Sequence, residues 1–183
     1  MASSRRRTDS RSARAPRRAL AGLLVAAAVS AVARSGADGQ ALPAGTSGTP
    51  FERAIRAAFA DAAARLADDP CLRVLAEFRD RAGVALSAKL EQTGSSAPDY
   101  VRGLAAADGD HRELCQPGNV LAGTRPGSRL VFFCARRFSR IQFLDPELAA
   151  AVVIHEALHS LGLSENPPSS QEITDRVLAR CRR

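Results

Sequence analysis

The sequence predicts a small, mainly helical α+β domain that carries a short sheet or hairpin and two disulfides. Helical stretches with capping signals lie at the start and at the end of segment 49–183. Between them, a turn signal at Pro126-Gly127 precedes a segment of strand character. Four widely spaced cysteines without a C-x-x-C pair favour two disulfides over a thiolate metal site. A chain of 183 residues is long enough for one such domain.

Residues 1–33 have the composition of an export signal. They contain seven arginines and one acid, an apolar run and a small-residue cleavage site at 31–33. The run is about fifteen residues long and a membrane-spanning helix needs roughly 20, so we expect no stable membrane insertion after the signal is removed. A short uncleaved anchor is the alternative. The signal predicts a secreted or periplasmic protein, and disulfides form in such compartments.

The basic excess of the chain belongs to this N-terminal segment. The net charge is +7, from 26 Lys and Arg against 19 Asp and Glu, and outside residues 1–33 it falls to +1, from 19 basic and 18 acidic residues. Nucleic-acid binding needs concentrated positive charge, so we expect no nucleic-acid partner. The Gly- and Pro-rich segment 34–48 is predicted to be a disordered linker, followed by the folded domain over 49–183.

The first half of the domain is expected to hold three helices and one strand. Segment 49–52, TPFE, combines an N-cap, a proline and a capping-box glutamate, and it opens a helix that runs to about residue 67. A second helical stretch is expected over 69–83, and a short helix within 95–108. Segment 84–90 alternates apolar residues with small or polar ones, which indicates a half-buried strand.

The middle of the chain should form a hairpin that determines the disulfide pairing. Pro126-Gly127 suits the centre of a type II turn, and segment 130–134 has strand character. The hairpin would bring Cys115 onto an element beside Cys134. This geometry favours Cys115–Cys134 and, by elimination, Cys71–Cys181.

An apolar helix expected between Asp145 and Gly162 carries two of the three histidines of the chain. His155 and His159 are four residues apart, so they share one helix face with Cβ atoms about 5–6 Å apart and can bind one metal ion. Glu156 would project beside that ion, where it can accept a proton from an activated water. The alternative is two core histidines bonded to backbone carbonyls, with Glu156 in a salt bridge.

The pattern His155-Glu156-x-x-His159 resembles the zinc-binding motif of the zincin metallopeptidases. Over about eleven residues the stretch is also similar to the metzincin signature, with Gly162 at its sharp turn and Glu165 at its third ligand. The resemblance implies Zn²⁺ bound by His155, His159 and Glu165, with Glu156 as general base. The only methionine is Met1, so the methionine turn of metzincins has no counterpart.

Two other residues could supply the third ligand. Glu172 opens the last predicted helix in a capping box with Ser169, and gluzincin-type zincins take a glutamate from such a later helix. His111, in a polar loop, is the remaining histidine. Tyr100 is the only phenol available to stabilise an oxyanion.

The resemblance therefore implies an exported zinc-dependent endopeptidase with a zincin-like domain over 49–183. Its expected partner is a peptide or protein substrate, bound in extended form along the edge of the strand near 128–135. The sequence predicts no particular oligomeric state. The alternative is a non-catalytic exported module whose zinc is closed in by four protein ligands, among them both Glu165 and Glu172.

Overall fold

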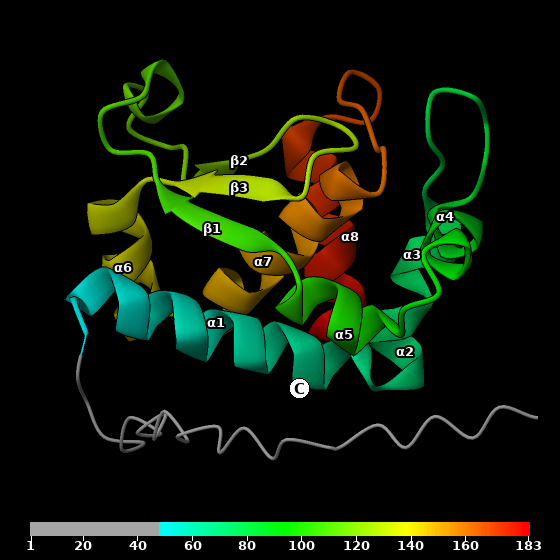
Figure 1. Cartoon of the computed structure of the whole chain (residues 1–183), viewed down its shortest axis with the longest axis horizontal. Coiled ribbons are helices and arrows are strands. Elements are labelled where there is room, and N and C mark those ends of the chain that lie inside the picture. The colour runs from blue at the N-terminus through cyan, green and yellow to red at the C-terminus, as the bar shows by residue number, and fades with distance from the viewer. Residues whose placement is uncertain (1–47) are drawn as a thin grey trace, which may run out of the picture. The chain divides into compact units, whose positions relative to one another are not determined.

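The computed structural model describes residues 48–183. The predicted export signal, and the predicted linker apart from its last residue, lie outside the described residues. The described part is an α+β fold in which helices pack against one face of a small three-stranded sheet (Figure 1), and the sequence predicts this fold class. No helix within 48–183 is both long and apolar enough to span a membrane.

Helices form most of the described part. The helix that Thr49 caps is present, with the capping box complete: Thr49 accepts from the N–H of Glu52, and the Glu52 carboxylate accepts from the N–H of Thr49. The helices are α1 (Pro50–Leu66), α2 (Asp69–Leu72), α3 (Val74–Glu77), α4 (Leu86–Gln92), α5 (Ala97–Arg102), α6 (Ala135–Leu144), α7 (Pro146–Ser160) and α8 (Ser170–Cys181), with a 3₁₀ turn, η1 (Glu113–Cys115).

The sheet has the strand order β1-β3-β2, with β1 (Ala105–Asp108) parallel and β2 (Ala122–Gly123) antiparallel to the central β3 (Leu130–Phe133). Its inner face packs on the helices. Val131 and Phe133 are buried, and the Phe133 ring contacts Phe51 and Phe59 of α1 and Phe138 of α6. The hairpin between β2 and β3 is confirmed, and Gly127 in its turn has a φ of 82°.

Helix α7 is the centre of the core. Every residue from Ala149 to Leu161 is buried, because α1, α6 and α8 all pack on this helix. Asp145 caps its N-terminus by accepting from the N–H of Leu148, and Pro146 occupies the first turn. The apolar helix predicted from the sequence is therefore present, and the motif residues lie in its last two turns.

Two sequence predictions for the first half of the domain are wrong. Segment 84–90 is not a strand: Leu86 and Leu90 are buried one turn apart on α4, because an alternating pattern also places apolar residues four positions apart, and that spacing fits one helix face. The second helical stretch does not reach residue 83. It ends at Glu77, and the Asp80 side chain then accepts from the N–H groups of Ala82 and Val84 in a turn.

Both predicted disulfides are present. Cys71–Cys181 joins α2 to the end of α8, and Cys115–Cys134 joins η1 to the residue after β3. The hairpin brings the second pair together in the way its turn signal predicts. The first crosslink therefore ties α2 to α8, which packs on α7.

Candidate metal centre

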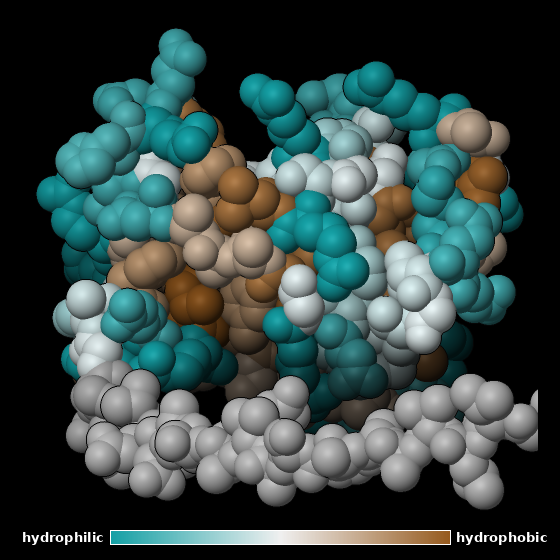
Figure 2. All heavy atoms as spheres, in the orientation of Figure 1, coloured by the Kyte–Doolittle hydropathy of each residue, from teal (hydrophilic) through white to brown (hydrophobic). Residues whose placement is uncertain are grey.

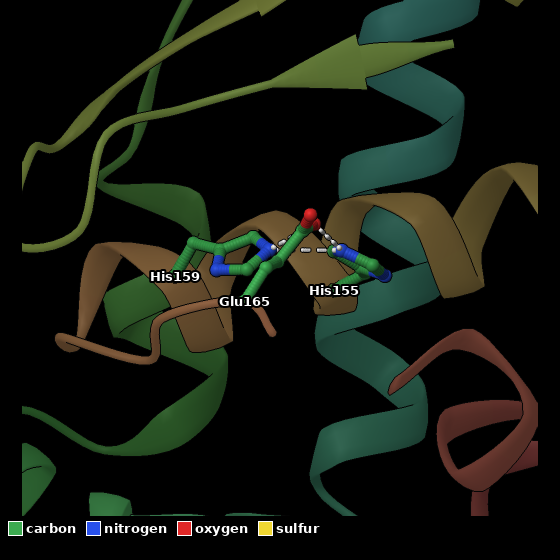
Figure 3. A group of neighbouring side chains, drawn as sticks. All are labelled: His155, His159 and Glu165. Carbon is green, nitrogen blue, oxygen red and sulfur yellow. Dashed lines mark hydrogen bonds and ion pairs between the residues drawn. The ribbon is translucent and has the colours of Figure 1, made fainter. Parts of the chain in front are cut away.

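His155 and His159 lie one turn apart on α7, and their rings meet on one side of the helix (Figure 3). Their Nε2 atoms are 2.9 Å apart, and each residue is only 5% exposed. Residues four positions apart share a helix face, so the sequence spacing accounts for this arrangement. Two buried imidazoles therefore converge on one point.

The chain turns sharply after α7 and brings Glu165 to the two histidines. Gly162 has a φ of 115°, and its N–H donates to the carbonyl of His159. Oε1 of Glu165 lies 3.2 Å from Nε2 of His159 and 3.7 Å from Nε2 of His155 (Figure 3). Ligand atoms about 2.1 Å from a tetrahedral metal ion are about 3.4 Å apart, so this group, the triad, has the dimensions of a metal site.

The second ring nitrogen of each histidine has its own partner. Nδ1 of His159 donates to the carbonyl of Leu163 at 2.9 Å, and Nδ1 of His155 lies 3.0 Å from the hydroxyl of Thr174 on α8. A carbonyl can only accept, so the proton of a neutral His159 sits on Nδ1 and its Nε2 presents a lone pair. Outer partners of this kind orient metal-binding histidines.

The triad brings more lone pairs together than protons can satisfy. A single proton on one Nε2 can satisfy only one of the three contacts among His155, His159 and Glu165, whereas a cation would satisfy all of them. The pKa of His155 is lowered to about 3, because burial disfavours the imidazolium and a charge on His159 would repel it. A neutral imidazole is the form that binds metal. The triad therefore fits a metal ion.

Glu156 lies beside the triad but outside it. The residue is 4% exposed, and its buried Oε2 has no hydrogen-bond partner in the described part of the chain. Burial, and then the charge of Glu165, raises the pKa of Glu156 to about 8, while the backbone N–H of Thr124 opposes the shift. This carboxyl can therefore take up or release a proton near neutral pH.

A cavity of about 680 Å³ opens beside the triad. Its walls come from α7, α8 and the segment 119–122 that leads into β2. His155, Glu156 and Glu165 all line it, so the site is accessible from outside. The predicted substrate edge was placed wrongly: β3 is the central strand, and the strand edge beside the cavity belongs to β2.

The other candidate residues lie outside the triad. The carboxylate of Glu172 pairs with Arg176, and the N–H of Glu172 donates to the side chain of the N-cap residue Ser169, so only the Ser169 half of the predicted capping box is present. His111 is exposed in its loop. The hydroxyl of Tyr100 is buried and lies 3.0 Å from the hydroxyl of Ser160, away from the residues that line the cavity.

Sequence reasoning missed two partners of the site. Thr174 is adjacent to Ile173 on the face of α8 that packs on α7, and a polar residue at that boundary was the available signal. The Leu163 carbonyl is a backbone group, so no residue type in the sequence could mark it as a partner of His159.

Comparison with known proteins returned no significant match to any family model, curated protein or solved structure. The functional assignment therefore depends on the residues of this chain and their geometry.

Proposed function

We propose that this chain is an exported zinc-dependent endopeptidase in which His155, His159 and Glu165 hold the metal and Glu156 is the general base. The observation that carries the proposal is the convergence of the triad at an accessible cavity, with a fourth residue, the buried Glu156, beside it. Two imidazoles and one carboxylate form a ligand set typical of catalytic zinc, which keeps one position open. The two disulfides are compatible with an extracellular location.

Bound zinc would polarise the scissile carbonyl and lower the pKa of a coordinated water towards 7. The residues of the chain would handle the protons. Glu156 would accept one at its carboxylate, hold it in the buried site and pass it to the departing amine. Its pKa of about 8 in the metal-free protein supports this role, since a nearby cation would draw the value down towards neutrality.

The rival function is an exported module with a structural zinc. Such a site needs a fourth protein ligand, and Glu172 was the candidate. The Glu172 carboxylate pairs with Arg176 and is not part of the triad, which favours a three-ligand, catalytic site. Binding of a hydroxamate inhibitor to the zinc-loaded protein separates the two, because only an open coordination position accepts it.

The proposal is tested by Glu156→Gln with Glu172→Gln as the matched control. The first variant should lose peptide hydrolysis and keep about one zinc per chain, because it removes the base and no ligand. The control should keep both, because its carboxylate faces Arg176. Zinc content is measured by elemental analysis and hydrolysis with a quenched fluorescent peptide library. Wild-type turnover in Glu156→Gln would contradict the proposed mechanism.

A further inference from the structure

A second cavity, of about 510 Å³, lies on the outer face of the sheet. We call it the outer-face cavity; its apolar wall comes from Leu114 and from Leu130 and Phe132 of β3. Side chains alternate along a strand, and the neighbours Val131 and Phe133 point into the core. Figure 2 shows the molecule hollowed over the sheet, between hydrophilic projections on both sides.

The outer-face cavity carries positive charge without a compensating acid. Arg112 and Arg125 both line it, and no Asp or Glu is among its lining residues. The guanidinium of Arg112 stacks over the Phe132 ring, with its carbon 3.5 Å from the ring centroid. This stacking orients its N–H groups before any ligand arrives. A planar carboxylate is the ligand that a guanidinium best complements.

The outer-face cavity adjoins the metal centre through Thr124. This residue lines the outer-face cavity, and its backbone N–H faces the Glu156 carboxyl beside the triad. The turn that follows is fixed to the motif helix, since the N–H of Gly127 donates to the carbonyl of His159 at 3.0 Å. Arg125 follows Thr124 directly in the sequence, so a basic residue of the outer-face cavity is one position from the residue that faces Glu156.

Among the described strands β2 pairs with β3 alone, so a peptide lying along the other edge of β2 would reach both cavities. Consecutive side chains of an extended chain point to opposite sides, and each residue advances about 3.3 Å. When the scissile bond lies at the triad, a side chain a few residues away therefore points to the outer face of the sheet. There it would meet Arg112 and Arg125, which line the outer-face cavity.

We propose that the outer-face cavity is a substrate subsite that selects an Asp or Glu side chain within about three residues of the scissile bond. This proposal rests on the proposed function. Arg112 and Arg125 bind the carboxylate, and Leu130 and Phe132 pack against the methylene groups of the same side chain. The subsite thus favours acidic peptide substrates over neutral and basic ones.

The test compares peptides that differ only by Glu, Gln or Lys at each position around one cleaved bond. We expect kcat/KM to be up to about fivefold higher for Glu than for Gln at one position, which is the upper end of what partly exposed charge pairs contribute. Arg125→Gln and Arg112→Gln should each lower this ratio, and Arg125→Glu should shift the preference towards Lys. Arg140→Gln, at an exposed arginine of α6, is the control and should leave ratio and rate unchanged.

Two results would overturn the subsite: equal cleavage of the Glu and Gln peptides, or a Glu preference that survives both arginine substitutions. If no peptide is cleaved, the proposed function fails, and fluorescence anisotropy with zinc-loaded Glu156→Gln still decides the subsite. Tighter binding of the Glu peptide that depends on Arg125 supports it. Equal binding of the Glu and Gln peptides refutes the subsite. It refutes the subsite also when an oligonucleotide binds through the same arginines.

Discussion

Replacing Glu165 by alanine tests whether this residue completes the metal site. Its side chain is 39% exposed and its carboxylate contacts two imidazoles, so without metal the substitution should change the free energy of unfolding by less than about 0.5 kcal/mol. With zinc the variant lacks one of three ligands. Loss of an outer-shell partner weakens metal binding about 10- to 100-fold, and we expect loss of a direct ligand to exceed about 100-fold.

The loss of zinc affinity corresponds to a smaller zinc-induced rise in melting temperature. Free zinc at 100 times its Kd stabilises the wild-type fold by about 2.7 kcal/mol, whereas a site 100-fold weaker contributes only about 0.4 kcal/mol. The difference of about 2.3 kcal/mol corresponds to roughly 7–11 °C in Tm for a folded part of this size. The zinc-induced rise in Tm should therefore be almost absent in Glu165→Ala.

Differential scanning fluorimetry with and without zinc measures this effect. Glu172→Ala is the matched control: its carboxylate faces Arg176, so any small loss of stability should be the same with and without metal. An equal zinc-induced rise in Glu165→Ala and in the wild type would refute Glu165 as the third ligand. If only Glu172→Ala loses the zinc-induced rise in Tm, Glu172 is the third ligand.

Two further predictions concern single side chains. Thr174→Val keeps the shape and removes the hydroxyl that holds Nδ1 of His155, so zinc affinity measured against a chromophoric chelator should fall about 10-fold or more; unchanged affinity would show that Thr174 does not orient the ligand. Asp80→Asn should weaken the acid sensitivity of the fold. Hydrogen bonds chiefly from the Val84 N–H lower the pKa of Asp80, so its contribution is present above the usual value of 3.8 and is lost as pH falls through the lowered one. Urea unfolding at pH 6 and pH 3 should show a smaller difference in the variant than in the wild type.

Local chemistry explains what could be predicted from the sequence. The capping box at Thr49, the proline after Asp145 and the i, i+4 histidines depend on neighbours within one helical turn, and each appears where expected. The third candidate ligand also depends on a local event, the glycine turn at residue 162. The spacing of the motif is therefore enough to predict which three residues form the triad.

The missed elements depend on tertiary contacts. β1 is alanine-rich and has little strand propensity of its own, and it forms because β3 offers a partner over all four of its residues. The sequence could not reveal that this pairing makes β3 central, which leaves β2 as the strand beside the cavity of about 680 Å³. Thr174 likewise reaches His155 only because α8 packs on α7.

The two disulfides predict that the described fold does not depend on a bound metal ion. Cys71–Cys181 and Cys115–Cys134 link positions 110 and 19 residues apart, which in the chain-entropy estimate stabilise by about 5 and about 3 kcal/mol. Either value matches or exceeds the roughly 2.7 kcal/mol of zinc at 100 times its Kd.

A chelator should therefore lower Tm and leave far-UV circular dichroism at 25 °C unchanged, and thermal unfolding should stay cooperative. A structural zinc behaves differently, because small domains that depend on one unfold when it is removed. Unfolding by the chelator at 25 °C, with both disulfides intact, would contradict the catalytic assignment and favour the non-catalytic module. Recovery of hydrolysis on adding zinc back to the folded, metal-free protein would support the catalytic one.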